Sequence, residues 1–107
     1  MKLVEENGQY YGFFANAFGG NYITRYDFGN SPANTPTAVN LNSDALLGNF
    51  TSGIDMIKEG NKWYMFLVAF SGNVLLRYEM DSLTQVNPNL TNLNIPGLAN
   101  PNNDKNN

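Results

Sequence analysis

The chain has 107 residues, enough for one small domain, and its 6 lysines and arginines against 9 aspartates and glutamates give a net charge of -3. This charge argues against nucleic acid as a partner, because affinity for the phosphate backbone comes from clustered lysine and arginine. Cysteine and histidine are both absent, which excludes disulfides, thiol catalysis, Cys/His zinc sites and histidine-dependent nucleophiles. Carboxylate chemistry, an oxygen-ligated metal and binding without catalysis stay open.

Two halves of the chain align with each other. Residues 4–15 match 57–68 at an offset of 53, and residues 18–28 and 36–42 match 70–80 and 88–94 at an offset of 52. The pairs that are identical include Glu6/Glu59, Tyr11/Tyr64, Phe13/Phe66, Phe18/Phe70, Gly20/Gly72, Arg25/Arg77, Tyr26/Tyr78 and Pro36/Pro88. This pattern predicts a tandem internal repeat.

The first copy has the turn signals of a strand-rich unit. Asn7-Gly8 is a strong signal for a two-residue hairpin, and Gly19-Gly20-Asn21 predicts the next turn. Between the copies, Asp44–Gly48 could form one helical turn. No apolar period of 3.6 residues extends over any useful length, so the chain is expected to be built from strands.

The second copy shows the same strands more clearly. Ile54–Lys58 alternates apolar and polar residues, as a half-buried strand does, and a turn follows at residues 59–61. Trp63–Phe70 carries no charge and is rich in aromatic residues, which predicts a strand buried on both faces. After a turn at residues 71–73, we expect a third strand over Val74–Met80 and a short last strand near Leu90–Leu93.

Four short strands per repeat, joined by tight turns, predict an all-β fold of two tandem four-stranded antiparallel β-propeller blades, a partial propeller. A blade between two neighbours buries both faces of its inner strands, whereas each strand of a two-sheet sandwich has one wet face. The apolar run in the second copy therefore favours blades. We expect the first blade over residues 1–53, the second over 54–95, and an Asn-rich disordered tail or the start of a missing blade over 96–107.

Two segments also resemble a known repeat. Residues 53–68, GIDMIKEGNKWYMFLV, are similar to a blade motif of the form G-I-D-I-V-K-D-G-G-N-W-Y-G-F-V, and residues 21–41 are similar to its continuation, R-L-D-F-G-N-S followed by N-T-P-T. The motif belongs to β-propellers found beside PKD-type and cell-surface sorting modules of large exported bacterial proteins. The resemblance implies a secreted or cell-surface location, with the export signal outside this chain. It implies no catalytic residues.

Two blades do not close a ring, so neighbouring blades are expected partners. They could come from a longer parent protein, of which this chain would be a fragment, or from other copies of the chain that assemble into one ring. A protein or carbohydrate at the cell surface is the other expected partner. No stretch is long and apolar enough to predict a membrane span.

Aromatic pairs are the first candidates for ligand binding. Trp63 with Tyr64, and Tyr10 with Tyr11, could stack against sugar rings, because the C–H faces of sugars pack on aromatic rings. Since neighbours on a strand point to opposite faces, the alternative is that one ring of each pair is core and the other packs between blades.

Charged residues supply one further candidate. Asp55 is expected on a first strand, facing the central channel of a propeller, and it aligns with Lys2, so no ring of acids is implied. The pairs Arg25/Asp27 and Arg77/Glu79 lie two residues apart on one strand face. We expect them to be structural pairs at the blade surface, of small energetic worth if exposed. The alternative is that they hold a polar ligand or supply a catalytic carboxylate.

The sequence does not predict an enzyme. No motif marks a pair of acids for glycoside hydrolysis, and no Asp-rich loop of the D-x-D-x-D type predicts calcium binding, so we expect no metal or cofactor. The expected function is a non-catalytic scaffold or recognition module. Two alternatives stay open: a small lectin that closes its ring by oligomerising, and part of a propeller enzyme whose catalytic residues lie outside this chain.

Overall fold

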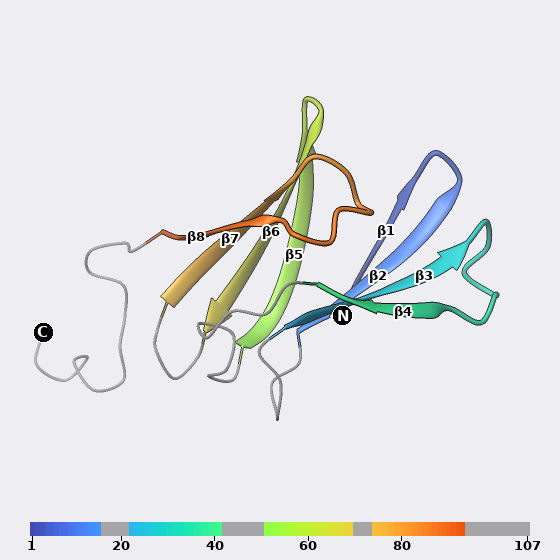
Figure 1. Cartoon of the computed structure of the whole chain (residues 1–107), viewed down its shortest axis with the longest axis horizontal. Helices are drawn as coiled ribbons and strands as arrows, with labels where there is room; N and C mark the ends of the chain where they lie inside the picture. The colour runs from blue at the N-terminus through green and yellow to red at the C-terminus, as the bar shows by residue number, and fades with distance from the viewer. Residues whose placement is uncertain (16–21, 42–50, 70–73, 94–107) are drawn as a thin grey trace, which may run out of the picture.

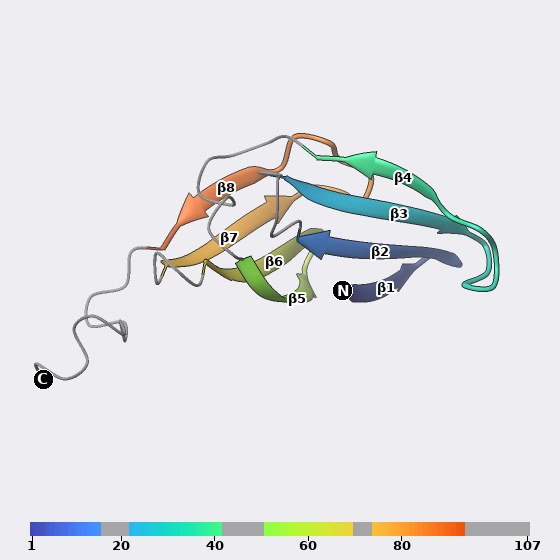
Figure 2. The same cartoon turned by 90° about the horizontal axis from the view of Figure 1, so that it is seen from below.

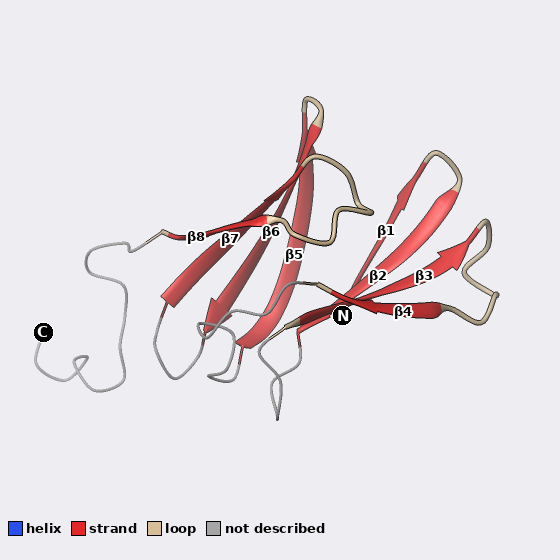
Figure 3. Cartoon of the chain, viewed as in Figure 1, coloured by secondary structure: helices blue, strands red, loops and turns tan. Residues whose placement is uncertain are grey.

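The computed structural model describes residues 1–15, 22–41, 51–69 and 74–93, and the regular secondary structure within these ranges is entirely β-strand (Figure 3). Eight strands form two antiparallel sheets, each with its strands paired in chain order. The first sheet contains β1 (Lys2–Glu6), β2 (Gln9–Ala15), β3 (Ile23–Gly29) and β4 (Thr37–Asn40). The second contains β5 (Thr51–Glu59), β6 (Lys62–Ala69), β7 (Val74–Met80) and β8 (Asn89–Asn92). The all-β prediction is therefore confirmed.

Tight hairpins begin both sheets. Asn7 and Gly8 link β1 to β2 with φ angles of 54° and 79°, and positive φ at both central residues is what a type I′ turn requires. The hairpin predicted at Asn7-Gly8 is confirmed. Gly60 takes a φ of 62° as the first of the two residues that link β5 to β6. The two hairpins thus have the same length.

Cross-strand partners in the two sheets coincide with the sequence alignment. Phe13 pairs with Arg25 in the first sheet, and Phe66 pairs with Arg77 in the second. Tyr11 pairs with Asp27, and Tyr64 correspondingly pairs with Glu79. Aligned residues of the two halves therefore lie at the same place in their sheets and point to the corresponding face.

The two sheets lie side by side with the same strand order, from β1 and β5 on one side to β4 and β8 on the other (Figures 1 and 2). β5 packs against β1 and β2. One face of each sheet points toward the other, and we name these the two inner faces. Between them lies the core, formed by Phe13, Ile23, Leu41, Met56, Trp63, Met65, Leu67, Leu76, Tyr78, Met80 and Leu83.

Among the described residues, no sheet lies against the opposite faces, which we name the outer faces. On β6 the side chains alternate: Trp63, Met65 and Leu67 are buried, whereas Tyr64 and Phe66 are half-buried. The expectation that this strand is buried on both faces is therefore wrong for the chain by itself. The physical reason is that, in the described part of the chain, a sheet covers one side of the second sheet and leaves the other side open.

Some expected features fall at or beyond the limits of the described residues. β5 extends across the expected boundary between residues 53 and 54. The helical turn at residues 44–48, the turns at 19–21 and 71–73 and the tail over 96–107 lie outside the described residues. In the part of the chain that is described, no helix is long and apolar enough to cross a membrane.

Candidate functional site

Glu6, at the end of β1, connects the two sheets. Its Oε2 accepts a hydrogen bond from Nζ of Lys58 at 2.6 Å and another from Nε1 of Trp63 at 3.1 Å. These contacts lower the pKa of Glu6; Lys58 is the main cause, and the effect outweighs the partial burial that acts in the opposite direction. A single carboxylate on the first sheet thus binds an ammonium and an indole of the second.

Arg25, on β3, makes the second polar link. Its guanidinium binds both carboxylate oxygens of Asp27, at 2.5 and 3.0 Å, and its Nη1 donates to the backbone carbonyl of Leu83 at 3.3 Å. Arg25 is only 5% exposed. The predicted Arg25–Asp27 pair is therefore confirmed, but Arg25 is buried rather than exposed, because the loop after β7 covers it.

Asp55 and Lys2 form the third link, at the strands β5 and β1. Nζ of Lys2 lies 3.2 Å from Oδ1 of Asp55, whose side chain is exposed. The pKa of Asp55 is lowered, first by Lys2 and then by the backbone N–H of Met56, which donates to the same oxygen. Asp55 is thus held as a carboxylate beside the lysine that aligns with it in sequence.

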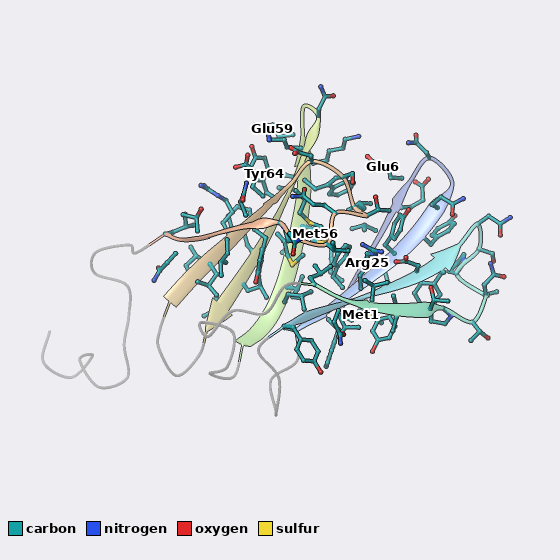
Figure 4. All side chains as sticks on the ribbon, in the orientation of Figure 1. Met1, Glu6, Arg25, Met56, Glu59 and Tyr64 are labelled. Carbon is teal, nitrogen blue, oxygen red and sulfur yellow. The ribbon has the colours of Figure 1, made fainter. Side chains whose placement is uncertain are left out.

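The five candidate binding residues do not form one site. Trp63 is buried between the sheets, where its N–H is bonded to Glu6, and Tyr11 packs against the core on the same side. Tyr10 and Tyr64 are half-buried on the outer faces of different sheets. Figure 4 shows Tyr64 on the side of the second sheet away from Arg25 and Met56, which lie between the sheets. Each aromatic pair is therefore split, with one ring inside and one outside.

A hollow of about 380 Å³ lies on the outer face of the second sheet. It combines apolar and charged side chains: Ile57, Glu59, Tyr64, Phe66, Arg77 and Glu79. Nε of Arg77 is buried there without a hydrogen-bond partner in the described part of the chain. Glu79 pairs with Lys62 at 3.0 Å. The expected Arg77–Glu79 pair is thus replaced by a lysine pair, and Lys62 has its pKa raised by Asp81 and Glu79.

A second hollow, of about 440 Å³, lies on the outer face of the first sheet and is mainly apolar. Its lining residues are Met1, Phe14, Tyr26, Phe28 and Pro36. Gly12 lies in the same face, and the side chains of Met1 and Leu3 cover it so closely that a Cβ there would be 3.0 Å from the Met1 sulfur. The aligned residue of the second sheet is the buried Met65.

Sequence reasoning missed Glu6, Lys58 and Leu83 as parts of this arrangement. Glu6 and Glu59 were recognisable as an identical aligned pair, but identity alone does not show that only Glu6 has a neighbouring sheet to bind. The chain offers no visible set of metal ligands: the described residues contain no group of three or more Asp or Glu side chains that could hold an ion. Comparison with models of protein families, with curated proteins and with solved structures finds no significant match.

Proposed function

We propose that this chain is a pair of consecutive β-propeller blades with a non-catalytic role, as a scaffold or recognition module of an exported or cell-surface protein. One observation carries the proposal: the inner face of the first sheet packs on a face of the second sheet that is not its aligned equivalent. Phe13 contributes to the core from the first sheet, whereas its aligned partner Phe66 points outward on the second. This is head-to-tail stacking.

A head-to-tail stack of only two similar units is incomplete. It leaves one free face at each end, and the free faces are satisfied when further units close a ring. A propeller is such a ring of four-stranded sheets around a channel. On this proposal Lys2 and Asp55 lie at the channel, and the similarity of residues 21–41 and 53–68 to exported propeller repeats supports the location.

The single tryptophan, Trp63, provides the test, because it lies between the proposed blades and is 8% exposed. If the blades form one stacked unit, Trp63 emission and far-ultraviolet circular dichroism report one coincident urea transition, and acrylamide quenches Trp63 weakly until that transition. A Trp63 that is fully quenched in the folded protein, or two separate transitions, would contradict the proposal.

A second candidate function is carbohydrate binding at the hollow beside Tyr64. The observation that favours it is the combination of a half-buried phenol ring with Arg77, Glu59 and Glu79, because aromatic faces pack on sugars and charged groups bond to hydroxyls. Glycan-array binding that Tyr64→Ala abolishes and Tyr10→Ala preserves would support it. Trp63 does not serve as the platform in this arrangement, since its ring is enclosed between the sheets.

A further inference from the structure

Both outer faces expose large apolar side chains. On the second sheet Ile57 is 60% exposed and Val68 is 40% exposed. On the first sheet Leu3 is 58% exposed and Phe14 is 44% exposed. Apolar residues gathered on one side of a sheet, rather than scattered singly, indicate a surface that binds a partner.

The alignment identifies what each outer face resembles. Ile57 and Phe66, on the outer face of the second sheet, align with Val4 and Phe13, which pack in the core from the first. Conversely, Leu3 on the outer face of the first sheet aligns with the buried Met56 of the second. The two outer faces therefore repeat the two surfaces that already pack together inside the molecule.

We infer that the outer face of the second sheet binds the outer face of the first sheet of another copy of this chain, head to tail. The inference rests on the proposed function, which it deepens by naming the partner. The new contact repeats the internal one. The outer face of the second sheet corresponds to the inner face of the first, the outer face of the first corresponds to the inner face of the second, and the two meet in the same head-to-tail order. A heterologous contact of this type closes into a ring if the rotation allows it and otherwise forms an open chain of copies.

Arg77 supports this contact. Arg25, its aligned equivalent, is buried between the sheets and donates to the carbonyl of Leu83, in the loop between the third and fourth strands of the neighbouring sheet. In Arg25 the loop carbonyl is bound by Nη1, whereas Nε binds Asp27. Nε of Arg77 is buried without a partner among the described residues, and Glu79, which aligns with Asp27, pairs with Lys62. By alignment it is therefore Nη1 of Arg77 that faces the position of a neighbouring loop. The corresponding loop of the first sheet, residues 30–36, offers backbone carbonyls. A second copy stacked head to tail brings this loop to Arg77.

The charges at the inner strands also fit. Lys2 and Asp55 occupy aligned positions and form an ion pair across the internal contact. Repeated stacking places Asp55 of one copy beside Lys2 of the next, so the two charges alternate from sheet to sheet. Adjacent opposite charges favour this register.

One position is less favourable than in the internal contact. Glu6 binds Lys58 and Trp63, whereas the aligned Glu59 meets the residues aligned with those two, which are Glu5 and Tyr10. Two glutamates then lie near each other in the new contact. Glu5→Lys converts this repulsion into the pair seen internally, so it should tighten the association about tenfold, and Glu5→Gln should tighten it less.

The experiment uses two variants of exposed residues, Ile57→Asp and Leu3→Asp, each of which places a charge in one outer face. Wild type should form a discrete oligomer or concentration-dependent chains in light scattering after size exclusion. Each variant alone should associate at least about tenfold more weakly. A 1:1 mixture should form heterodimers, because Leu3→Asp keeps the second-sheet face and Ile57→Asp keeps the first-sheet face.

Two results would overturn the inference: wild type that remains monomeric at high concentration, or a mixture that associates no better than its components. Trp63 quenching measured on the same samples separates this failure from failure of the proposed function. A monomer with Trp63 protected means that the two sheets stack but another copy does not cover them. A monomer with Trp63 fully quenched removes both proposals.

Discussion

Phe13 and Phe66 occupy the same place in the two sheets, yet their surroundings differ completely. Each lies on the second strand and pairs with an arginine on the third. Phe13 has no exposed surface, whereas Phe66 is half-buried in an open hollow. Local sequence determines strand and register, but the burial of a side chain depends on which face receives a neighbour.

Truncating the two phenylalanines should give the largest difference in stability between the inner and the outer faces. Phe13→Ala removes a fully buried ring and leaves a cavity between the sheets, so we expect a loss of about 3–5 kcal/mol in the free energy of unfolding. Phe66→Ala removes a ring that water already reaches and should cost about 1–2 kcal/mol. Urea unfolding followed by circular dichroism measures both under conditions where wild type is monomeric.

Equal losses for the two variants would contradict the difference between the inner and outer faces. Thermal unfolding across a range of protein concentrations is the matched control, because self-association stabilises the outer face and would increase the cost of Phe66→Ala. If the outer face is covered in an assembly, the difference between the variants should shrink as concentration rises.

The same comparison shows which features could be predicted from the sequence. The Asn7-Gly8 hairpin, the third strand over Val74–Met80 and the alternation along Ile54–Lys58 depend on local residues, and the structure has strands and a turn there. The partner of Glu6 could not be predicted, because Lys58 and Trp63 lie more than fifty residues away in the chain. Which face of each sheet is covered depends on the stacking, and no local pattern encodes it.

Replacing the two aligned arginines should give a smaller difference in stability between the inner and the outer faces. Arg25→Met removes the partner of Asp27 and of the Leu83 carbonyl, so we expect destabilisation of about 1–3 kcal/mol. Arg77→Met removes a buried Nε without a hydrogen-bond partner among the described residues, so it should leave the monomer within about 0.5 kcal/mol of wild type or stabilise it.

When association rather than stability is measured, Arg77→Met should have a larger effect than Arg25→Met. Arg77→Met should weaken the head-to-tail contact, since the inference gives Arg77 a carbonyl of the second copy, whereas Arg25→Met acts inside one chain. Light scattering across a dilution series separates the two. If Arg77→Met destabilises the monomer as strongly as Arg25→Met does, then Arg77 is already fully bonded within its own chain.

The smallest expected effect is on stability at acidic pH, and it tests the contact of Glu6 with the second sheet. The pKa of Glu6 is lowered in the folded protein, chiefly by Lys58, so its contribution to stability is present above the ordinary value of 4.5 and is lost as the pH falls through the lowered value. Glu6→Gln should therefore cost about 1 kcal/mol near neutral pH and flatten the decline in urea midpoint as the pH falls below the ordinary value of 4.5.

Lys58→Met identifies the cause of that decline. It keeps most of the aliphatic stem of Lys58 but removes the charge that lowers the pKa of Glu6, so it should flatten the decline to a similar degree. The double variant should add little to either single change, because both remove the same pair. A residual decline persists in all three, since Lys2 also lowers the pKa of Asp55 and that carboxylate loses its pair in the same acidic range. Fully additive effects of Glu6→Gln and Lys58→Met would instead mean that the two side chains act independently, and the polar contact across the sheets would then depend on Arg25 and the Lys2–Asp55 pair.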